Sequence, residues 1–238
     1  MKQINNMSIK DIYKVESINK DQTHEWLLYK HYAKRLPSIS YSFGLFKEDV
    51  LVGVCTYGIP ASDQLLRCCG DEYRKIAFEL NRLIKNDGLE KNTQSYFVAQ
   101  TFKLLPKPMI IISYSDPNNG HNGYTYQSLN FLYTGKGGGT KEYIINNKQL
   151  HSRHINKNWF IKNKLNYDSD KNIVENFIQV GGEIYRPKPK NRYIMFLGSK
   201  TQKKNMLKNL KYDIKPYPKG NNDNYDTGYK PTTQGVLF

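Results

Sequence analysis

The residue types best suited to chemistry lie in one stretch, Ser113–Gly135, with the sequence SYSDPNNGHNGYTYQSLNFLYTG. It continues the apolar run 109–112, which is typical of a buried strand, and it contains an Asp-Pro-Asn-Asn-Gly turn. Polar groups at the carboxyl end of a strand face an open crevice, so the stretch predicts a functional site. Asp116 can accept a proton from an amine or orient it. The alternative role for Asp116 is to form an Asx-Pro turn.

Three further residues of this stretch are candidates for the same site. Tyr126 follows Asp116 by ten residues and is predicted to lie on the next helix, facing the same crevice. Its hydroxyl can serve as a general acid or donate to a developing oxyanion, although a tyrosine in an aromatic-rich helix also serves packing alone. His121 lies in the segment NGHNG, where neighbouring glycines allow a substrate to approach closely. Ser113, at the end of the apolar run, completes the set.

Charge is distributed unevenly along the chain, whose net charge is +15. Residues 1–135 hold 16 Lys and Arg against 13 Asp and Glu, whereas residues 136–238 hold 20 against 8. This asymmetry indicates a polyanionic partner; a merely basic surface is the alternative. Tyr and Asn are mixed with Lys in 186–193 and 212–225, a pattern that suits phosphate contacts beside base stacking. The candidate DNA-contacting residues are Lys34, Arg35, Arg153, Lys188, Lys190 and Arg192.

The elements that must position these residues follow from the hydrophobic periodicity. Their order is that of an α/β protein with parallel and antiparallel strand pairs in a mixed sheet flanked by helices. We expect strands over 7–17, 77–84, 109–115 and 141–150, a hairpin over 39–58, helices over 20–34, 93–105, 124–133 and 154–166, and a terminal hairpin over 181–198. The domain prediction is one domain over 1–200, with a core 7–135 and a basic second half 136–200, followed by a basic, partly extended tail 201–238.

Several classes of protein are disfavoured. No apolar run reaches the ~18 residues typical of a membrane span, and the N-terminus lacks a signal-peptide core, so we expect a cytoplasmic protein that does not bind membranes. The three cysteines predict reduced thiols. His151 and His154 are three residues apart, as metal ligands on one helix face would be, but no third ligand is near. We therefore predict no metal site, with iron left open to metal analysis.

The motifs HYAKR at 31–35, FELNRL at 78–83 and SYSD at 113–116 together resemble the phage Mom family. The resemblance implies a GNAT-like acyltransferase fold and an enzyme acting on double-stranded DNA in the host cytoplasm. Its reaction would convert the N6 amino group of adenine to an acetamido (carbamoylmethyl) derivative that blocks restriction endonucleases. By the same resemblance His31 and Tyr32 belong to the site, beside Asp116 and Tyr126.

The resemblance also implies where a donor would bind. In GNAT-like folds the fourth and fifth strands splay apart around a CoA thioester, and the pyrophosphate lies at the N-terminus of the following helix. An acyl-CoA-type donor would then lie between strands 77–84 and 109–115 and at the turn 86–95. The usual R/Q-x-x-G-x-G/A loop is replaced there by NDGLEKNTQS. The candidate cofactor-binding residues are Arg82, Asn92, Thr93, Ser95 and Asn130.

Some alternatives stay open at this point. Arg82 is suited to holding a phosphate or a carboxylate, or to an ordinary salt bridge. The chain as a whole also fits a non-enzymatic nucleic-acid-binding protein on a GNAT-like fold, or a GNAT acyltransferase acting on a small amine. The sequence does not decide between a monomer and a homodimer.

Overall fold

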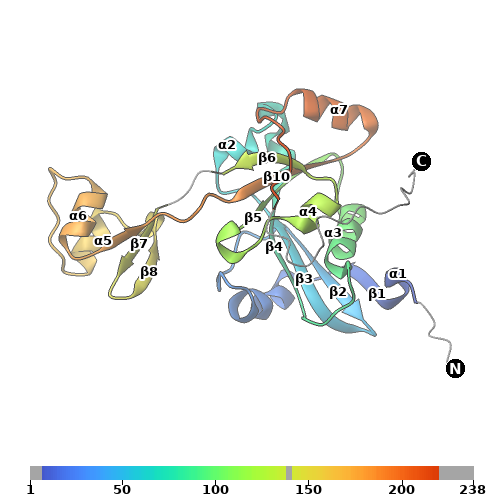
Figure 1. Cartoon of the computed structure of the whole chain (residues 1–238), viewed down its shortest axis with the longest axis horizontal. Helices are drawn as coiled ribbons and strands as arrows, with labels where there is room; N and C mark the ends of the chain where they lie inside the picture. Colours follow the sequence, from blue (N-terminus) through green and yellow to red (C-terminus); the bar gives the residue numbers. More distant parts are fainter. Residues whose placement is uncertain (1–6, 138–140, 220–238) are drawn as a thin grey trace.

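The computed structural model describes residues 7–137 and 141–219, with the side chains of Asn119, His151 and Arg153 excepted. A seven-stranded mixed sheet in the order β1-β2-β3-β4-β5-β10-β6 forms the larger part of the molecule (Figure 1). β4 and β5 are parallel, and the other neighbouring strands are antiparallel. The strands are β1 (Tyr13–Ser17), β2 (Tyr41–Lys47), β3 (Val50–Gly58), β4 (Ala77–Lys85), β5 (Met109–Ser115), β6 (Leu132–Lys136) and β10 (Asn191–Leu197).

Helices cover both faces of this sheet, and β5 is buried between them. Successive side chains of a strand point to opposite faces: Ile111 packs with the cluster around α3, whereas Ile110 and Ile112 pack with Met206 of α7. A strand buried on both faces has a continuous apolar sequence, which explains the run at 109–112. The helices of this domain are α1 (Ile9–Ile12), α2 (Asp63–Leu66), α3 (Thr93–Leu104), α4 (Tyr124–Ser128) and α7 (Lys200–Lys208). No helix in the described ranges has the length and apolarity that a membrane span requires.

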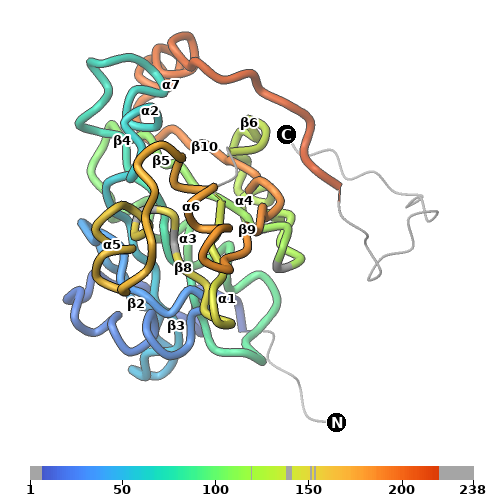
Figure 2. Tube along the Cα trace, turned by 90° about the vertical axis from the view of Figure 1, so that its left-hand side faces the viewer, coloured from blue at the N-terminus to red at the C-terminus, as the bar shows by residue number. Residues whose placement is uncertain are grey.

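Residues 142–185, which we call the insert, form a separate small unit between β6 and β10. It stands apart from the large sheet in Figure 1, and Figure 2 views the molecule from the side on which it lies. Its own hydrophobic cluster includes Phe160 and Phe177, both fully buried. Its sheet has the order β8-β7-β9. The elements are β7 (Glu142–Ile145), β8 (Lys148–His151), α5 (Lys157–Lys162), α6 (Ile173–Gln179) and β9 (Glu183–Tyr185).

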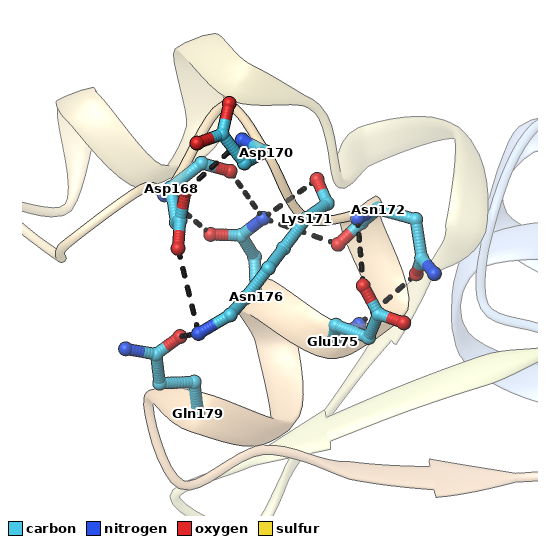
Figure 3. A network of polar contacts seen from close by, with 7 residues as sticks. All are labelled: Asp168, Asp170, Lys171, Asn172, Glu175, Asn176 and Gln179. Atoms are coloured by element: carbon cyan, nitrogen blue, oxygen red, sulfur yellow. Dashed lines mark hydrogen bonds and ion pairs between the residues drawn. The ribbon is translucent and has the colours of Figure 1, made fainter.

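A buried asparagine organises the loop that precedes α6 in the insert (Figure 3). The Asn176 amide donates to the carbonyls of Asp168, Lys171 and Asn172, and its oxygen accepts from the backbone N–H of Asp168. Asn172 and Glu175 add a reciprocal capping box at the start of the helix. Because both the nitrogen and the oxygen of the Asn176 side-chain amide bond the backbone of this loop, the side chain fixes one loop conformation.

Much of the expected fold is confirmed. The strands over 77–84 and 109–115, the hairpin over 39–58 and the helix over 93–105 are present as β4, β5, β2–β3 and α3. The mixed α/β class with flanking helices is also confirmed. The segment 7–17 is a strand only from Tyr13, after the short helix α1.

Three expected helices are wrong in extent, and the one over 154–166 is present only as α5, Lys157–Lys162. The expected single strand over 141–150 is two paired antiparallel strands, β7 and β8. The helix over 20–34 ends at Lys30, because the backbone of His31 is extended. It begins as a 3₁₀ turn, Lys20–Thr23, and finishes as a π-helix, Trp26–Lys30. The helix over 124–133 stops at Ser128, because Leu132 and Tyr133 pair with β10. Asn130 therefore lies in the connection between α4 and β6, not on a helix.

The terminal hairpin over 181–198 is also wrong. Its two arms belong to different sheets: β9 pairs with β7 in the insert, whereas β10 lies between β5 and β6. Two helices, α6 and α7, were not expected. Each begins with a capping box, Asn172 with Glu175 and Ser199 with Gln202, which is a signal that the sequence carries.

Candidate active site

The cleft of interest opens where β4 and β5 separate. The two strands pair only from Ala77 with Ile110 to Leu80 with Ser113. Beyond these pairs β4 follows β3 and β5 follows β10, so the strands part and leave a cleft of about 800 Å³. Its lining comes from the end of the π-helix and the segment after it, most of β4 from Glu79 onward, the turn after β4 with the start of α3, the end of β5, the 120–126 loop with α4, and Lys190.

Asp116 lies at the end of β5 and lines the cleft. One carboxylate oxygen accepts from the backbone N–H and side-chain amide of Asn118, and the other lies 3.0 Å from Lys190 Nζ. Burial favours a higher pKa, but the hydrogen bonds from Asn118 and Lys190 outweigh it, so the pKa of Asp116 is lowered. Asp116 thus forms the Asx turn and also presents a fixed negative charge to the cleft.

Tyr126 faces the same cleft from α4. Its ring packs between Phe131 and Tyr193, with both pairs of ring centroids 5.3 Å apart. Burial raises the pKa of Tyr126 to about 12, against the opposing effect of the Ser113 hydroxyl. The hydroxyl is therefore protonated at neutral pH and can act as a hydrogen-bond donor or a general acid.

His31 and Tyr32 form one wall of the cleft. Their rings stack with centroids 4.3 Å apart, and His31 Nδ1 accepts from the backbone N–H of Ala33. This bond leaves the proton of the neutral imidazole on Nε2. Burial, reinforced by Arg82, Lys190 and Arg35, lowers the pKa of His31 to about 4. A neutral imidazole at neutral pH is the consequence.

Glu79 on β4 is a site residue that was absent from the sequence-based candidates. Its carboxyl lines the cleft, and burial raises its pKa despite the nearby cations Arg82, Lys190 and Arg35. A carboxylate with a raised pKa is better matched to proton abstraction near neutral pH than Asp116 is. Alternation along AFELNRLI places Glu79 and Asn81 on one face, so the signal was present; its burial was not visible in the sequence.

The remaining candidates from the Ser113–Gly135 stretch differ in position. His121 is exposed and lines the cleft. Ser113 is buried beneath it, with its hydroxyl donating to the carbonyl of Leu80 across the last β4–β5 pair. Ser113 therefore interacts with the hydroxyl of Tyr126 and stabilises the β4–β5 pair beneath the cleft.

The five cofactor-binding candidates are not brought together. Arg82 lines the cleft. Thr93 and Ser95 direct their hydroxyls to the carbonyls of Glu90 and Asn92 in the turn before α3. Asn92 and Asn130 take left-handed backbone conformations, with φ of +67° and +59°. None of these four side chains lines the cleft.

The six DNA-contacting candidates do not lie together on one surface either. Arg35 and Lys190 line the cleft, and Lys34 and Lys188 are exposed outside it. Arg192 is half-buried: its guanidinium lies 3.5 Å from the ring centroid of Tyr212 and donates to the hydroxyl and carbonyl oxygens of Thr134. The side chain of Arg153 lies outside the described part of the structure.

His151 and His154 have the three-residue spacing of metal ligands. The side chain of His151 is not described, and the described side chains contain no cluster of three or more His, Cys, Asp or Glu arranged to hold a metal ion. The cleft residues themselves supply carboxyl, phenol and cationic groups.

The parted fourth and fifth strands, with β10 between β5 and β6, define the class as a GNAT-like α/β fold, as the sequence resemblance implied. Within that class the chain belongs to the Mom protein family, whose model matches residues 12–219. Comparison with curated protein sequences gives no match.

Solved acetyltransferase structures are distant neighbours. An N-acetyltransferase from Staphylococcus aureus Mu50 is 11% identical over 78% of this chain and 98% of its own, with a TM-score of 0.41. A putative acetyltransferase from Salmonella typhimurium, solved with its cofactor acetyl-CoA, is 8% identical over 79% and 95%, with a TM-score of 0.42. A Bacillus subtilis acetyltransferase in complex with CoA is 13% identical over 78% and 98%, with a TM-score of 0.39. At these identities and TM-scores, the neighbouring structures do not support an inference about the activity of this protein.

Proposed function

We propose that the protein transfers a small carbonyl-bearing group to the N6 amino group of adenine in double-stranded DNA. In phage DNA the product would be an acetamido (carbamoylmethyl) adenine, which would protect the phage DNA from host restriction. Membership of the Mom protein family supports this proposal. One observation carries the proposal: the half-buried carboxyl of Glu79, the protonated hydroxyl of Tyr126 and several cations line the same cleft.

The target adenine has to leave the base stack to reach this cleft, because a compact pocket cannot contact N6 within a duplex. The volume of about 800 Å³ falls within the range of roughly 300–1,000 Å³ that is usual for small-ligand sites. Tyr32 and Tyr124 line the cleft and remain 58% and 48% exposed. Their aromatic faces are available to stack on an extruded base.

The chemistry assigns one proton transfer to each of two groups. The N6 lone pair is delocalised into the purine ring, so N6 must lose a proton as its bond to the electrophilic carbon of the donor forms. The Glu79 carboxylate accepts that proton. As the bond between this carbon and its leaving group breaks, Tyr126 donates its proton to the leaving group. Asp116 stays anionic and holds Lys190 in place.

An acyl-CoA-type donor is compatible with the cleft. Lys30 and Lys85 converge on Asn86 at the start of the turn, with Nζ atoms 2.7 Å from its side-chain oxygen and 3.3 Å from its carbonyl oxygen. The space around Gly88 is open. Two ammonium groups beside open backbone suit a pyrophosphate, so Lys30 and Lys85 would hold it. When bound, a thioester would supply an electrophilic carbonyl carbon, and direct transfer from it would give an N6-acyl adenine with release of the CoA thiol. A carbamoylmethyl product needs a donor that presents its methylene carbon, with the leaving group on that carbon, to N6.

Nucleoside mass spectrometry of DNA from cells expressing the protein tests the proposal. We expect wild-type protein to produce a heavier adenine nucleoside and DNA that resists restriction. Glu79→Gln and Tyr126→Phe should each lower the rate at which modified adenine accumulates by about 10²–10⁴-fold, the usual contribution of a general acid or base to a reaction rate. Asp116→Asn should also lower it, because Lys190 loses its partner.

Tyr29→Phe is the matched control, because Tyr29 is 77% exposed and lies outside the cleft. Unmodified DNA from cells with folded wild-type protein would contradict the enzymatic proposal. It would favour a non-enzymatic DNA-binding protein if duplex binding persists, or a small-amine acyltransferase if duplex binding is absent.

A further inference from the structure

Three cations from three separate elements meet at one end of the cleft. Arg35 follows the π-helix, Arg82 lies on β4, and Lys190 precedes β10. All three act electrostatically on both His31 and Glu79. The three charges therefore surround the same small volume, although they are far apart in sequence.

Their internal partners do not use all of their hydrogen-bonding capacity. Lys190 pairs with Asp116, and the Arg82 guanidinium donates to the carbonyl of Asn81. The Nε of Arg82 is buried without a hydrogen-bond partner. No ion pair of Arg35 or Arg82 is found within residues 7–137 and 141–219. An unpaired buried donor costs about 1–3 kcal/mol, so a native structure retains one where something else satisfies it.

The same charges repel each other in the free protein. Burial, and after it the positive charge of Arg35, lowers the pKa of Arg82. Both guanidinium groups line the same cleft, so their charges repel each other where burial limits the solvation of Arg82. Glu79 offsets only part of this charge, since burial raises its own pKa. A bound anion would remove the repulsion. The planar guanidinium fork matches the oxygen atoms of a phosphate in two-bond geometry.

We propose that Arg35, Arg82 and Lys190 form a phosphate-binding subsite of the cleft, which holds the phosphate group of the extruded adenine nucleotide. The inference rests on the proposed function and adds how the flipped nucleotide is held. The phosphate fixes the sugar, and the sugar places the base against Glu79 and Tyr126. Lys30 and Lys85 bond Asn86, just after β4, and stay available for a phosphate-bearing donor.

Calorimetric titration with deoxyadenosine 5′-monophosphate and with deoxyadenosine tests the subsite without requiring catalysis. We expect the wild-type protein to bind the nucleotide at least about tenfold more tightly than the nucleoside. Arg82→Gln and Arg35→Gln should each reduce this ratio to below about threefold. Arg35 lies in a loop, so its variant keeps the test valid if Arg82→Gln fails to fold. Lys103→Gln removes an exposed charge outside the cleft and should keep the wild-type ratio.

Titration with CoA separates the two sources of phosphate. If Arg35→Gln and Arg82→Gln weaken CoA binding but leave the nucleotide-to-nucleoside ratio unchanged, the subsite serves the donor and the DNA assignment is wrong. The subsite is refuted if neither variant changes the nucleotide-to-nucleoside ratio or the affinity for CoA. It is also refuted if the wild-type protein does not bind deoxyadenosine 5′-monophosphate more tightly than deoxyadenosine. DNA modification by the wild type is scored separately, so failure of the subsite and failure of the proposed reaction remain distinguishable.

Discussion

The large sheet domain and the insert use polar side chains in opposite ways. In the large domain Glu79, Arg82 and Tyr126 line an open cleft, and the Nε of Arg82 has no partner. In the insert Asn176 is 1% exposed, and its amide is fully engaged by its own loop. Among the described residues of 142–185, none lines the cleft. Polar groups that satisfy each other specify a fold, whereas polar groups left unsatisfied in a cleft are available to a ligand.

Charge separates the two regions as well. The insert holds six Lys and Arg and five Asp and Glu, so it is nearly neutral. Residues 186–219, which include β10 and α7 of the large domain, hold eleven Lys and Arg and one Asp. The basic excess of the second half of the chain therefore belongs to the segment that returns to the large sheet. The first two of the following three predictions test this division between the regions, and the third concerns the cleft of the large domain alone.

The largest expected effect is on stability, because each region has its own core. Phe177→Ala should cost the insert about 3–5 kcal/mol, as is usual for a fully buried phenylalanine. Hydrogen exchange should then accelerate within 142–185, while the affinity of the cleft for deoxyadenosine 5′-monophosphate stays unchanged. The equivalent change Phe97→Ala, in the core beneath α3, should weaken that affinity. Equal loss of binding in both variants would mean that the two cores fold as one unit.

A smaller effect concerns the path of the DNA backbone. Replacing Arg186 and Lys188 together by Gln should flatten the log–log salt dependence of duplex binding by about two, since each phosphate contact contributes about −0.9. Both residues are exposed in the connection that leads into β10. The matched pair Lys162→Gln and Lys164→Gln removes the same charge from the insert and should leave the slope unchanged. The reverse result would place the duplex on the insert.

The smallest effect is the pH dependence of folding that His31 confers. Its folded pKa of about 4 lies below the ordinary value of 6.5, so between these values the unfolded chain binds a proton that the native protein does not. The free energy of unfolding should therefore rise with pH from about 4 to 6.5, and the contribution of His31 is complete above that window. His31→Gln should remove this part of the slope in denaturant titrations at several pH values. His24→Gln, outside the cleft, should retain it.

Local signals in the sequence determined several parts of this protein. The apolar run at 109–112 predicts β5, because a strand buried on both faces has no alternation. The position of Asp116 after that strand predicts a crevice residue, because the carboxyl end of a strand faces open space. The ten-residue spacing predicts that Tyr126 shares the crevice, and both residues line the cleft.

Other parts were decided by contacts between distant segments. β10 lies between β5 and β6, so Leu132–Lys136 becomes a strand, and the expected helix and hairpin around these segments fail. The same strand brings Lys190 to Asp116, across a separation in sequence that no local pattern encodes. Glu79 was visible as a residue on one face of β4, but its raised pKa comes from burial by other elements. Periodicity reports local conformation, whereas burial and charge pairing depend on which distant segments meet.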